Sequence, residues 1–179
     1  MSLKKIKIIN VVFLFLLSFL WHFVYDWFPN NIFALFFPVN ESIWEHMKII
    51  YFCLFMGSIL EFVLCKKNNI KINNFYIEAM VKSILGVIFY LIIFIPFYLW
   101  LGESMLISIS LMLITYIFME YIGYKILTGE EMNINILPVI IIVLGCIMFV
   151  ILTFYPLHNF LFFDEVKFGY GILKYCLLY

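Results

Sequence analysis

Five long apolar segments follow one another along this chain of 179 residues. Each has about 18 residues or more, the length that crosses the hydrocarbon core of a bilayer as a helix. Their approximate bounds are residues 8–25, 47–65, 77–101, 105–127 and 134–155. The sequence therefore predicts an all-α bundle of five transmembrane helices, in which residues 1–179 form a single integral membrane domain.

The composition excludes a water-soluble globule. Only 12% of the residues are charged and 66% are hydrophobic, whereas a soluble domain is about a quarter charged. The net charge is zero and all eleven basic residues are lysines without a basic patch, so no nucleic-acid partner is expected. The four cysteines form no CxxC motif and are interpreted as buried apolar residues: Cys53, Cys65, Cys146 and Cys176.

The connections also follow from the pattern. The first apolar segment has a basic start, but it is too long for a signal peptide and lacks a small-residue cleavage site, so we interpret it as an uncleaved anchor. Residues 28–41 contain only a short apolar run and predict an interfacial or shallow re-entrant segment before the second span. Gly102 to Ser104 predict a tight turn between the third and fourth spans.

Lysine placement predicts the orientation, because cytoplasmic loops carry the excess of lysine and arginine. With the N-terminus inside and the C-terminus outside, eight lysines lie on the cytoplasmic side and three on the outer side. The inner lysines are Lys4, Lys5, Lys7, Lys66, Lys67, Lys71, Lys82 and Lys125, and the outer ones are Lys48, Lys167 and Lys174. The tryptophans Trp21, Trp27, Trp44 and Trp100 all fall at the predicted outer interface.

All three histidines are predicted on the outer side, each with acidic residues nearby. His22 ends the first span, His46 opens the second, and His158 follows the fifth. The candidate pocket also includes Asp26 at i+4 from His22, the segment residues Asn40, Glu41, Trp44 and Glu45, and Asp164. Because each of these groups adjoins apolar sequence, we expect the three helix ends to meet around a shared polar pocket.

Three imidazoles and a carboxylate suit Zn²⁺ or another divalent first-row transition metal. In this hypothesis His22, His46 and His158 are ligands, the metal activates a bound water near neutral pH, and Glu45 or Asp26 serves as general base. The alternative is a structural polar network. Glu45 supports that alternative, because Ser42 and Glu45 form a capping-box pattern at a helix start.

A second set of polar residues lies toward the predicted cytoplasmic side. Glu61 and Glu120 fall within apolar spans, with Lys82 at similar depth. An intramembrane carboxylate is a candidate functional residue. Three interpretations stay open for this set: a buried Glu61–Lys82 ion pair, side chains that extend to the interface, and a proton or cation relay.

The chain also resembles a known family. The residues that carry the resemblance are His22–Trp27 (HFVYDW), Phe37–Lys48 (FPVNESIWEHMK), Phe154–His158 (FYPLH), Asp164 and Tyr170–Ile172. This pattern resembles uncharacterised multi-pass membrane proteins of clostridia and related Firmicutes, catalogued as domain of unknown function 6512. The tail departs from that pattern at Asp164-Glu165 and Phe168-Gly169. The resemblance implies a bacterial cell membrane and a five-helix topology, and it implies no activity.

Three classes of function remain at this stage. The first is metal-assisted hydrolysis of a lipid-like or membrane-embedded substrate at the histidine pocket. The second is a small proton- or cation-coupled transporter centred on Glu61 and Glu120, which would need a homodimer because five helices are few for alternating access. The third is a non-catalytic accessory subunit whose outer surface serves a protein partner.

The orientation can be tested by cysteine labelling in a background without native cysteines. We expect Lys71→Cys to react with a membrane-impermeant thiol reagent only after the cells are permeabilised, because it lies on the predicted cytoplasmic side. Lys167→Cys is the matched control and should react in intact cells. Labelling of Lys71→Cys from outside intact cells would contradict the topology.

Overall fold

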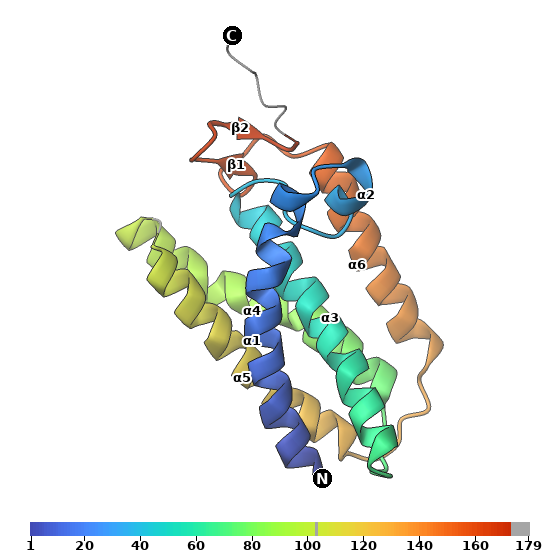
Figure 1. Cartoon of the computed structure of the whole chain (residues 1–179). Coiled ribbons are helices and arrows are strands. Elements are labelled where there is room, and N and C mark those ends of the chain that lie inside the picture. The colour runs from blue at the N-terminus through green and yellow to red at the C-terminus, as the bar shows by residue number, and fades with distance from the viewer. Residues whose placement is uncertain (103, 173–179) are drawn as a thin grey trace.

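The computed structural model describes residues 1–102 and 104–172. Glu103, Lys174 and Cys176, which entered the sequence analysis, lie outside the described residues. Within the described part, helices and two short strands follow one another along the chain (Figure 1). They are α1 (Leu3–Trp27), α2 (Asn31–Ala34), α3 (Ile43–Lys67), α4 (Phe75–Leu101), α5 (Met105–Leu127), α6 (Ile136–Phe154), β1 (Phe163–Asp164) and β2 (Gly169–Tyr170).

The five predicted spans correspond to α1, α3, α4, α5 and α6, and each is long and apolar enough to cross a membrane. Two of them begin earlier than the apolar runs suggest, because a serine caps each start. Ser2 Oγ accepts a hydrogen bond from the Lys5 amide at 3.4 Å, and Ser42 Oγ accepts one from the Glu45 amide at 3.3 Å. The charged first turns are therefore helical as well.

Four helices form a closed ring in which α1 packs against α3, α3 against α4, α4 against α5, and α5 against α1. The fifth long helix, α6, lies outside this ring and packs against α4. It also contacts α3, because the Tyr51 hydroxyl donates a hydrogen bond to the Ile142 carbonyl at 2.5 Å. The most buried span is α3, with 61% of its most apolar window inside the protein.

Glycines allow the ring helices to approach closely. A Cβ on Gly86 of α4 would lie 2.2 Å from Leu54 Cδ1 of α3, and a Cβ on Gly57 of α3 would lie 2.6 Å from Leu14 Cδ2 of α1. Leu54 and Leu14 are both fully buried. Small residues at such positions are typical of membrane helix interfaces, where packing rather than the hydrophobic effect holds helices together.

The two irregular segments gather at one end of the bundle (Figure 1). The segment between α1 and α3 contains α2, which is too short to cross a bilayer and is capped by the Asn30 side chain. The tail after α6 contains an antiparallel hairpin of β1 and β2, which the sequence analysis did not predict. Asp164 Oδ1 accepts hydrogen bonds from the Val166 and Lys167 amides and so closes the hairpin turn.

We call the end of the bundle that carries His22 and His46 the histidine end, and the end that carries Lys7 and Lys82 the lysine end. The α1 N-terminus and the α3–α4 connection lie at the lysine end, and the β-hairpin covers the histidine end (Figure 1). That the histidine end faces the cell exterior remains a prediction.

Close packing at Gly86 can be tested directly. We expect Gly86→Val to lower the free energy of unfolding by about 1–3 kcal/mol, because the added atoms overlap the buried Leu54 side chain. Ile88→Val, two residues along on the exposed face of α4, is the control and should unfold like the wild-type protein. Thermal unfolding in detergent measures both, and equal stability of all three proteins would contradict the packing argument.

Candidate functional site

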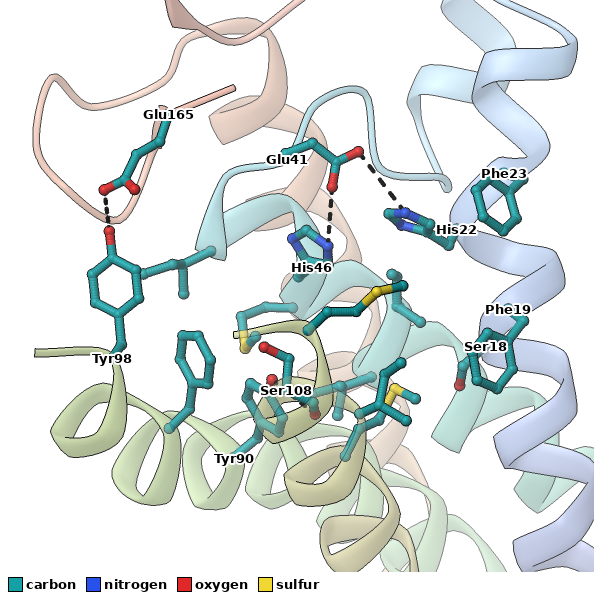
Figure 2. A pocket seen from close by; sticks show the side chains of 18 of the residues that line it. Ser18, Phe19, His22, Phe23, Glu41, His46, Tyr90, Tyr98, Ser108 and Glu165 are labelled. Carbon is teal, nitrogen blue, oxygen red and sulfur yellow. Dashed lines mark hydrogen bonds and ion pairs between the residues drawn. The ribbon is translucent and has the colours of Figure 1, made fainter. Parts of the chain in front are cut away.

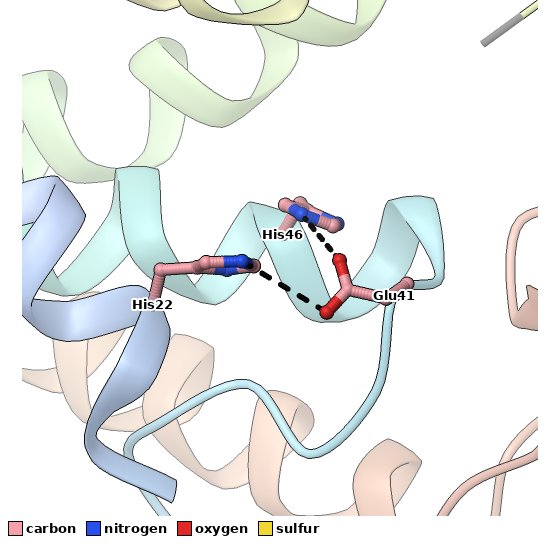
Figure 3. Close-up of side chains that lie close together, drawn as sticks. All are labelled: His22, Glu41 and His46. Atoms are coloured by element: carbon pink, nitrogen blue, oxygen red, sulfur yellow. Dashed lines mark ion pairs between the residues drawn. The ribbon is translucent and has the colours of Figure 1, made fainter. Parts of the chain in front are cut away.

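Two imidazoles and one carboxylate converge at the histidine end (Figure 3). His22 Nε2 lies 3.8 Å from Glu41 Oε1, and His46 Nε2 lies 3.5 Å from Glu41 Oε2. The two imidazole rings are stacked, with centroids 5.3 Å apart. One ligand atom from each of the three residues lies within 4.8 Å of the others, a set that could hold a metal ion. The predicted meeting of His22 and His46 is therefore observed.

A helix start orients the His46 ring. Ser42 caps α3, and its carbonyl lies 3.0 Å from His46 Nδ1. A carbonyl can only accept, so this contact places a proton on Nδ1. In the neutral ring Nε2 is then an acceptor, and it faces the Glu41 carboxylate, which also accepts. Two facing acceptors need a hydrogen-bond donor or a metal ion to bridge them.

The loop that carries Glu41 is held by the C-terminal hairpin. The Glu41 amide donates to Asp164 Oδ2 at 3.0 Å, and Asn40 Nδ2 donates to the Gly171 carbonyl at 2.8 Å. Asn40 Oδ1 accepts from the Ser42 amide at 2.9 Å. Asp164 is fully buried. The hairpin thus fixes Glu41 opposite the two histidines, although more than 120 residues separate these segments.

The three residues lie at the rim of a cavity of about 310 Å³ between α1, α3, α4 and α5 (Figure 2). Its wall is mainly apolar and includes Phe19, Met47, Ile50, Phe94, Ile109 and Met112. Ser18, Tyr90 and Ser108 add hydroxyl groups deeper in the cavity. A polar rim above an apolar interior is the form expected for a site that takes an amphipathic molecule.

A second polar pair lies across the cavity from the histidines. The Tyr98 hydroxyl, from α4, donates a hydrogen bond to Glu165 of the hairpin (Figure 2). Both residues line the cavity. Sequence reasoning missed this pair. The chain offers no local signal for it, because Tyr98 lies within an apolar span and Glu165 lies in a turn 67 residues later.

His158 lies outside this cluster, so the expected convergence of three imidazoles is not observed. It is exposed, and its ring stacks on Tyr170 with centroids 4.6 Å apart. Asp26, predicted as a possible base, is exposed and lies outside the ligand set.

Glu45, the other predicted base, is part of a structural pair instead. Its Oε2 lies 2.9 Å from Lys48 Nζ and accepts from the Val39 amide at 3.1 Å, and its Oε1 accepts from the Thr153 hydroxyl at 2.7 Å. Glu45 is 2% exposed and does not line the cavity. Lys48 also donates to the Ala34 carbonyl, so the pair joins α3 to α2 and α6.

Four further residues were predicted to line the pocket: Asn40, Glu41, Trp44 and Asp164. Of these four, Glu41 borders the cavity and the other three do not. Trp44 packs between Phe149 and Phe162, with ring centroids at 4.9 and 4.8 Å. Asn40 and Asp164 support the Glu41 loop, as described above. These three residues therefore shape the site without contacting the space in which a ligand would lie.

The second predicted set lies at the lysine end and is larger than expected. The Glu61–Lys82 ion pair is present, at 3.4 Å, and Glu120 lies 2.5 Å from Lys82 Nζ. Lys7 of α1 and Glu78 of α4 complete the group. The sequence analysis counted Lys7 among the cytoplasmic lysines and did not predict that it is buried, at 7% side-chain exposure, in this group.

The sequence matches the model of a protein family described as a family of unknown function, DUF6512, over residues 1–172. The chain belongs to this family. Neither a curated protein nor a solved structure matches it. Family membership assigns no reaction. The five long apolar helices support a multi-pass membrane protein, and its function has to be argued from the geometry of the cavity and the buried charges.

The role of Asp164 in holding Glu41 can be tested. We expect Asp164→Ala to speed amide hydrogen exchange at Glu41, Val166 and Lys167, because each amide loses its acceptor at a cost of roughly 1–3 kcal/mol. Asp26→Asn, an exposed carboxylate at the same end, is the control. Unchanged protection of the Glu41 amide in Asp164→Ala would show that the hairpin does not hold this loop.

Proposed function

We propose that this integral membrane protein is a metal-dependent hydrolase of a lipid-like substrate, with His22, His46 and Glu41 as the metal ligands. The observation that carries the proposal is the convergence of two imidazoles and one carboxylate at the rim of an apolar cavity. Two histidines and one glutamate are a known ligand set for catalytic zinc.

The distances support this assignment. Ligand atoms at 2.0–2.2 Å from a tetrahedral zinc lie about 3.4 Å from one another. The Nε2 atoms of His46 and His22 lie 3.5 and 3.8 Å from the Glu41 oxygens, close to that separation. The Ser42 carbonyl beside His46 Nδ1 matches the outer contact that usually orients a metal-bound histidine.

The cavity supports an amphipathic substrate. Phe19, Phe23 and Met105 line it and are also exposed on the outside of the helix bundle. The cavity therefore borders the surface that lipid would cover. In this proposal an apolar chain lies between α1 and α5, and the polar group to be cleaved lies at the rim beside His22 and His46.

The residues at the rim of the cavity suggest how hydrolysis would proceed. A bound divalent metal would act as a Lewis acid and acidify a water molecule for attack. Glu165 is the remaining carboxylate that lines the cavity, and it replaces Glu45 and Asp26 as our candidate base. Its hydrogen bond with Tyr98 fixes its orientation across the cavity from the ligand set.

The transporter hypothesis has less support. Its residues Glu61 and Glu120 are not among those that line the cavity, and each is engaged by lysine. The accessory-subunit hypothesis would leave the Glu41–histidine cluster without a role. A bacterial plasma membrane, with the histidine end outside, is the location that the proposal assumes.

Metal binding is the direct test. We expect wild-type protein in detergent, stripped with chelator, to bind about one Zn²⁺ per chain in a calorimetric titration. His22→Ala, His46→Ala and Glu41→Gln should each weaken binding by more than about tenfold, because each removes a ligand.

His158→Ala is the matched control, since His158 is exposed at the same end but outside the cluster. It should bind zinc like the wild-type protein. No binding by the wild-type protein, or equal loss in His158→Ala, would contradict the proposal.

A further inference from the structure

Five charged side chains are buried together at the lysine end, where α1, α3, α4 and α5 meet. They are Lys7 of α1, Glu61 of α3, Glu78 and Lys82 of α4, and Glu120 of α5. Their side chains are between 0 and 7% exposed. We call this group the buried charge cluster.

The ion pairs within the buried charge cluster are short and shared. Lys82 Nζ lies 2.5 Å from Glu120, 2.9 Å from Glu78 and 3.4 Å from Glu61. Lys7 Nζ lies 2.6 Å from Glu61 and 3.1 Å from both Glu78 and Glu120. Each ammonium group therefore contacts all three carboxyl groups.

The formal charges of the cluster do not balance. Three carboxylates against two ammonium groups leave a net charge of −1. Among the described residues, the other groups that face the cluster are neutral: Asn10 of α1, whose amide donates to Glu120 at 2.8 Å, and the buried Cys65, one turn after Glu61. The remaining lysines at this end are exposed on the surface of the bundle: Lys4, Lys5, Lys66, Lys67, Lys71 and Lys125.

An isolated buried charge is unfavourable by several kcal/mol even after the protein relaxes. Within a membrane no bulk water compensates for it, and ionisable groups there pair with one another. The cluster therefore needs one more positive charge. We propose that its three carboxyl groups bind one proton between them, which makes the buried charge cluster a proton-binding site.

Unpaired acceptors support this proposal. Glu78 Oε2 and Asn10 Oδ1 are buried and have no hydrogen-bond partner among the described residues. Oxygen atoms of Glu61, Glu78 and Glu120 lie within 4.8 Å of one another. A carboxyl O–H would donate to one of these acceptors, as buried polar groups normally require.

The space around the cluster favours a proton over a metal cation. Between the carboxylates lie the two Nζ atoms, in the positions that a cation would take. Gly123 of α5 closes one side, because a Cβ there would lie 2.6 Å from Lys7 Nζ and 2.7 Å from Glu78 Oε1. A proton adds charge without needing volume.

This site is separate from the histidine cavity, since it lies at the other end of α1. Protonation acts on helix packing, because Lys7 and Asn10 attach α1 to the other three helices of the ring. Loss of the proton would leave the excess negative charge where these helices meet. If the zinc titration fails, the proton-binding site is unaffected. If the proton-binding site is disproved, the proposed zinc site is unaffected.

The test uses three isosteric variants of the full chain: Glu61→Gln, Glu78→Gln and Glu120→Gln. Each removes one negative charge and balances the cluster without a proton. We expect the infrared band of a protonated carboxyl group, present in the wild-type protein at neutral pH, to be absent from every variant that folds. Its assignment is checked by its shift in D₂O.

The pH dependence of protein stability should reveal the same bound proton. The folded wild-type protein holds one proton that the unfolded chain lacks, so its stability falls as pH rises. Above about pH 5, where the glutamates of the unfolded chain are ionised, we expect its folding equilibrium constant to drop about tenfold per pH unit relative to each Glu→Gln variant for as long as the band persists. If the folding equilibrium constants of the wild-type protein and the Glu→Gln variants depend on pH in the same way, the proposal is overturned.

Glu45→Gln is the matched control, because Glu45 is equally buried but pairs one-to-one with Lys48. It should lose thermal stability and keep the infrared band. Two further results would overturn the proposal: no protonated carboxyl band in the wild-type protein, or a rise in wild-type stability with Na⁺ or K⁺ that the Glu61→Gln variant does not show. The second result would assign the missing charge to a metal cation.

Discussion

Ion pairs between buried charged side chains join the helices of this protein. In a bilayer, helices gain little from burying apolar surface against each other, since lipid is equally apolar. Lys7 and Lys82, held by carboxylates from three helices, supply specific contacts that apolar surfaces lack. The buried face of α1 is accordingly polar in part: Lys7, Asn10 and Ser18 are buried there beside Ile6 and Leu14, whereas many of its other apolar side chains are exposed on the outside of the bundle. Ser18 shares a hydrogen bond with Tyr116 of α5, so polar contacts continue along the helix.

At the histidine end, polar side chains satisfy the backbone groups of non-helical segments. There the chain leaves helical structure twice, in the segment before α3 and in the hairpin after α6. Each irregular segment satisfies its backbone through the other: Asp164 and Asn40 pair the hairpin with the Glu41 loop, and the Glu45–Lys48 pair joins α3 to its neighbours. The cavity is what remains between a ring of helices and this cover. The rim of the cavity is polar because polar loops lie above it. The interior is apolar because apolar side chains of the membrane-spanning helices line it.

Features set by local spacing could be predicted from the sequence. Span number followed from apolar length. The Glu78–Lys82 ion pair has i,i+4 spacing on one helix, which is a local signal too, although the sequence analysis above did not use it. His22 and His46 lie beside helix ends that the topology places together, so their meeting was also predictable. The position of His158 was not, because it lies in the irregular segment after α6 and its ring stacks on Tyr170 of the unpredicted hairpin. The Lys7 pairs join residues 54 and 71 positions apart. The sequence does not say which carboxylates pair with Lys7. It does offer one local signal that Lys7 is buried: Lys7 and Asn10 lie three residues apart, and so on one face, of an otherwise apolar helix.

The partners of α1 also bear on how the protein is made. Lys7 and Asn10 enter the membrane with the first helix, yet their carboxylate partners belong to α3, α4 and α5, which are synthesised later. Until Glu120 has been inserted, α1 carries an amide without its acceptor and a lysine that must extend to the headgroups. The first helix to enter the bilayer therefore completes its polar contacts only after α5 has been inserted, and a nascent chain that stops before α5 cannot complete the ring.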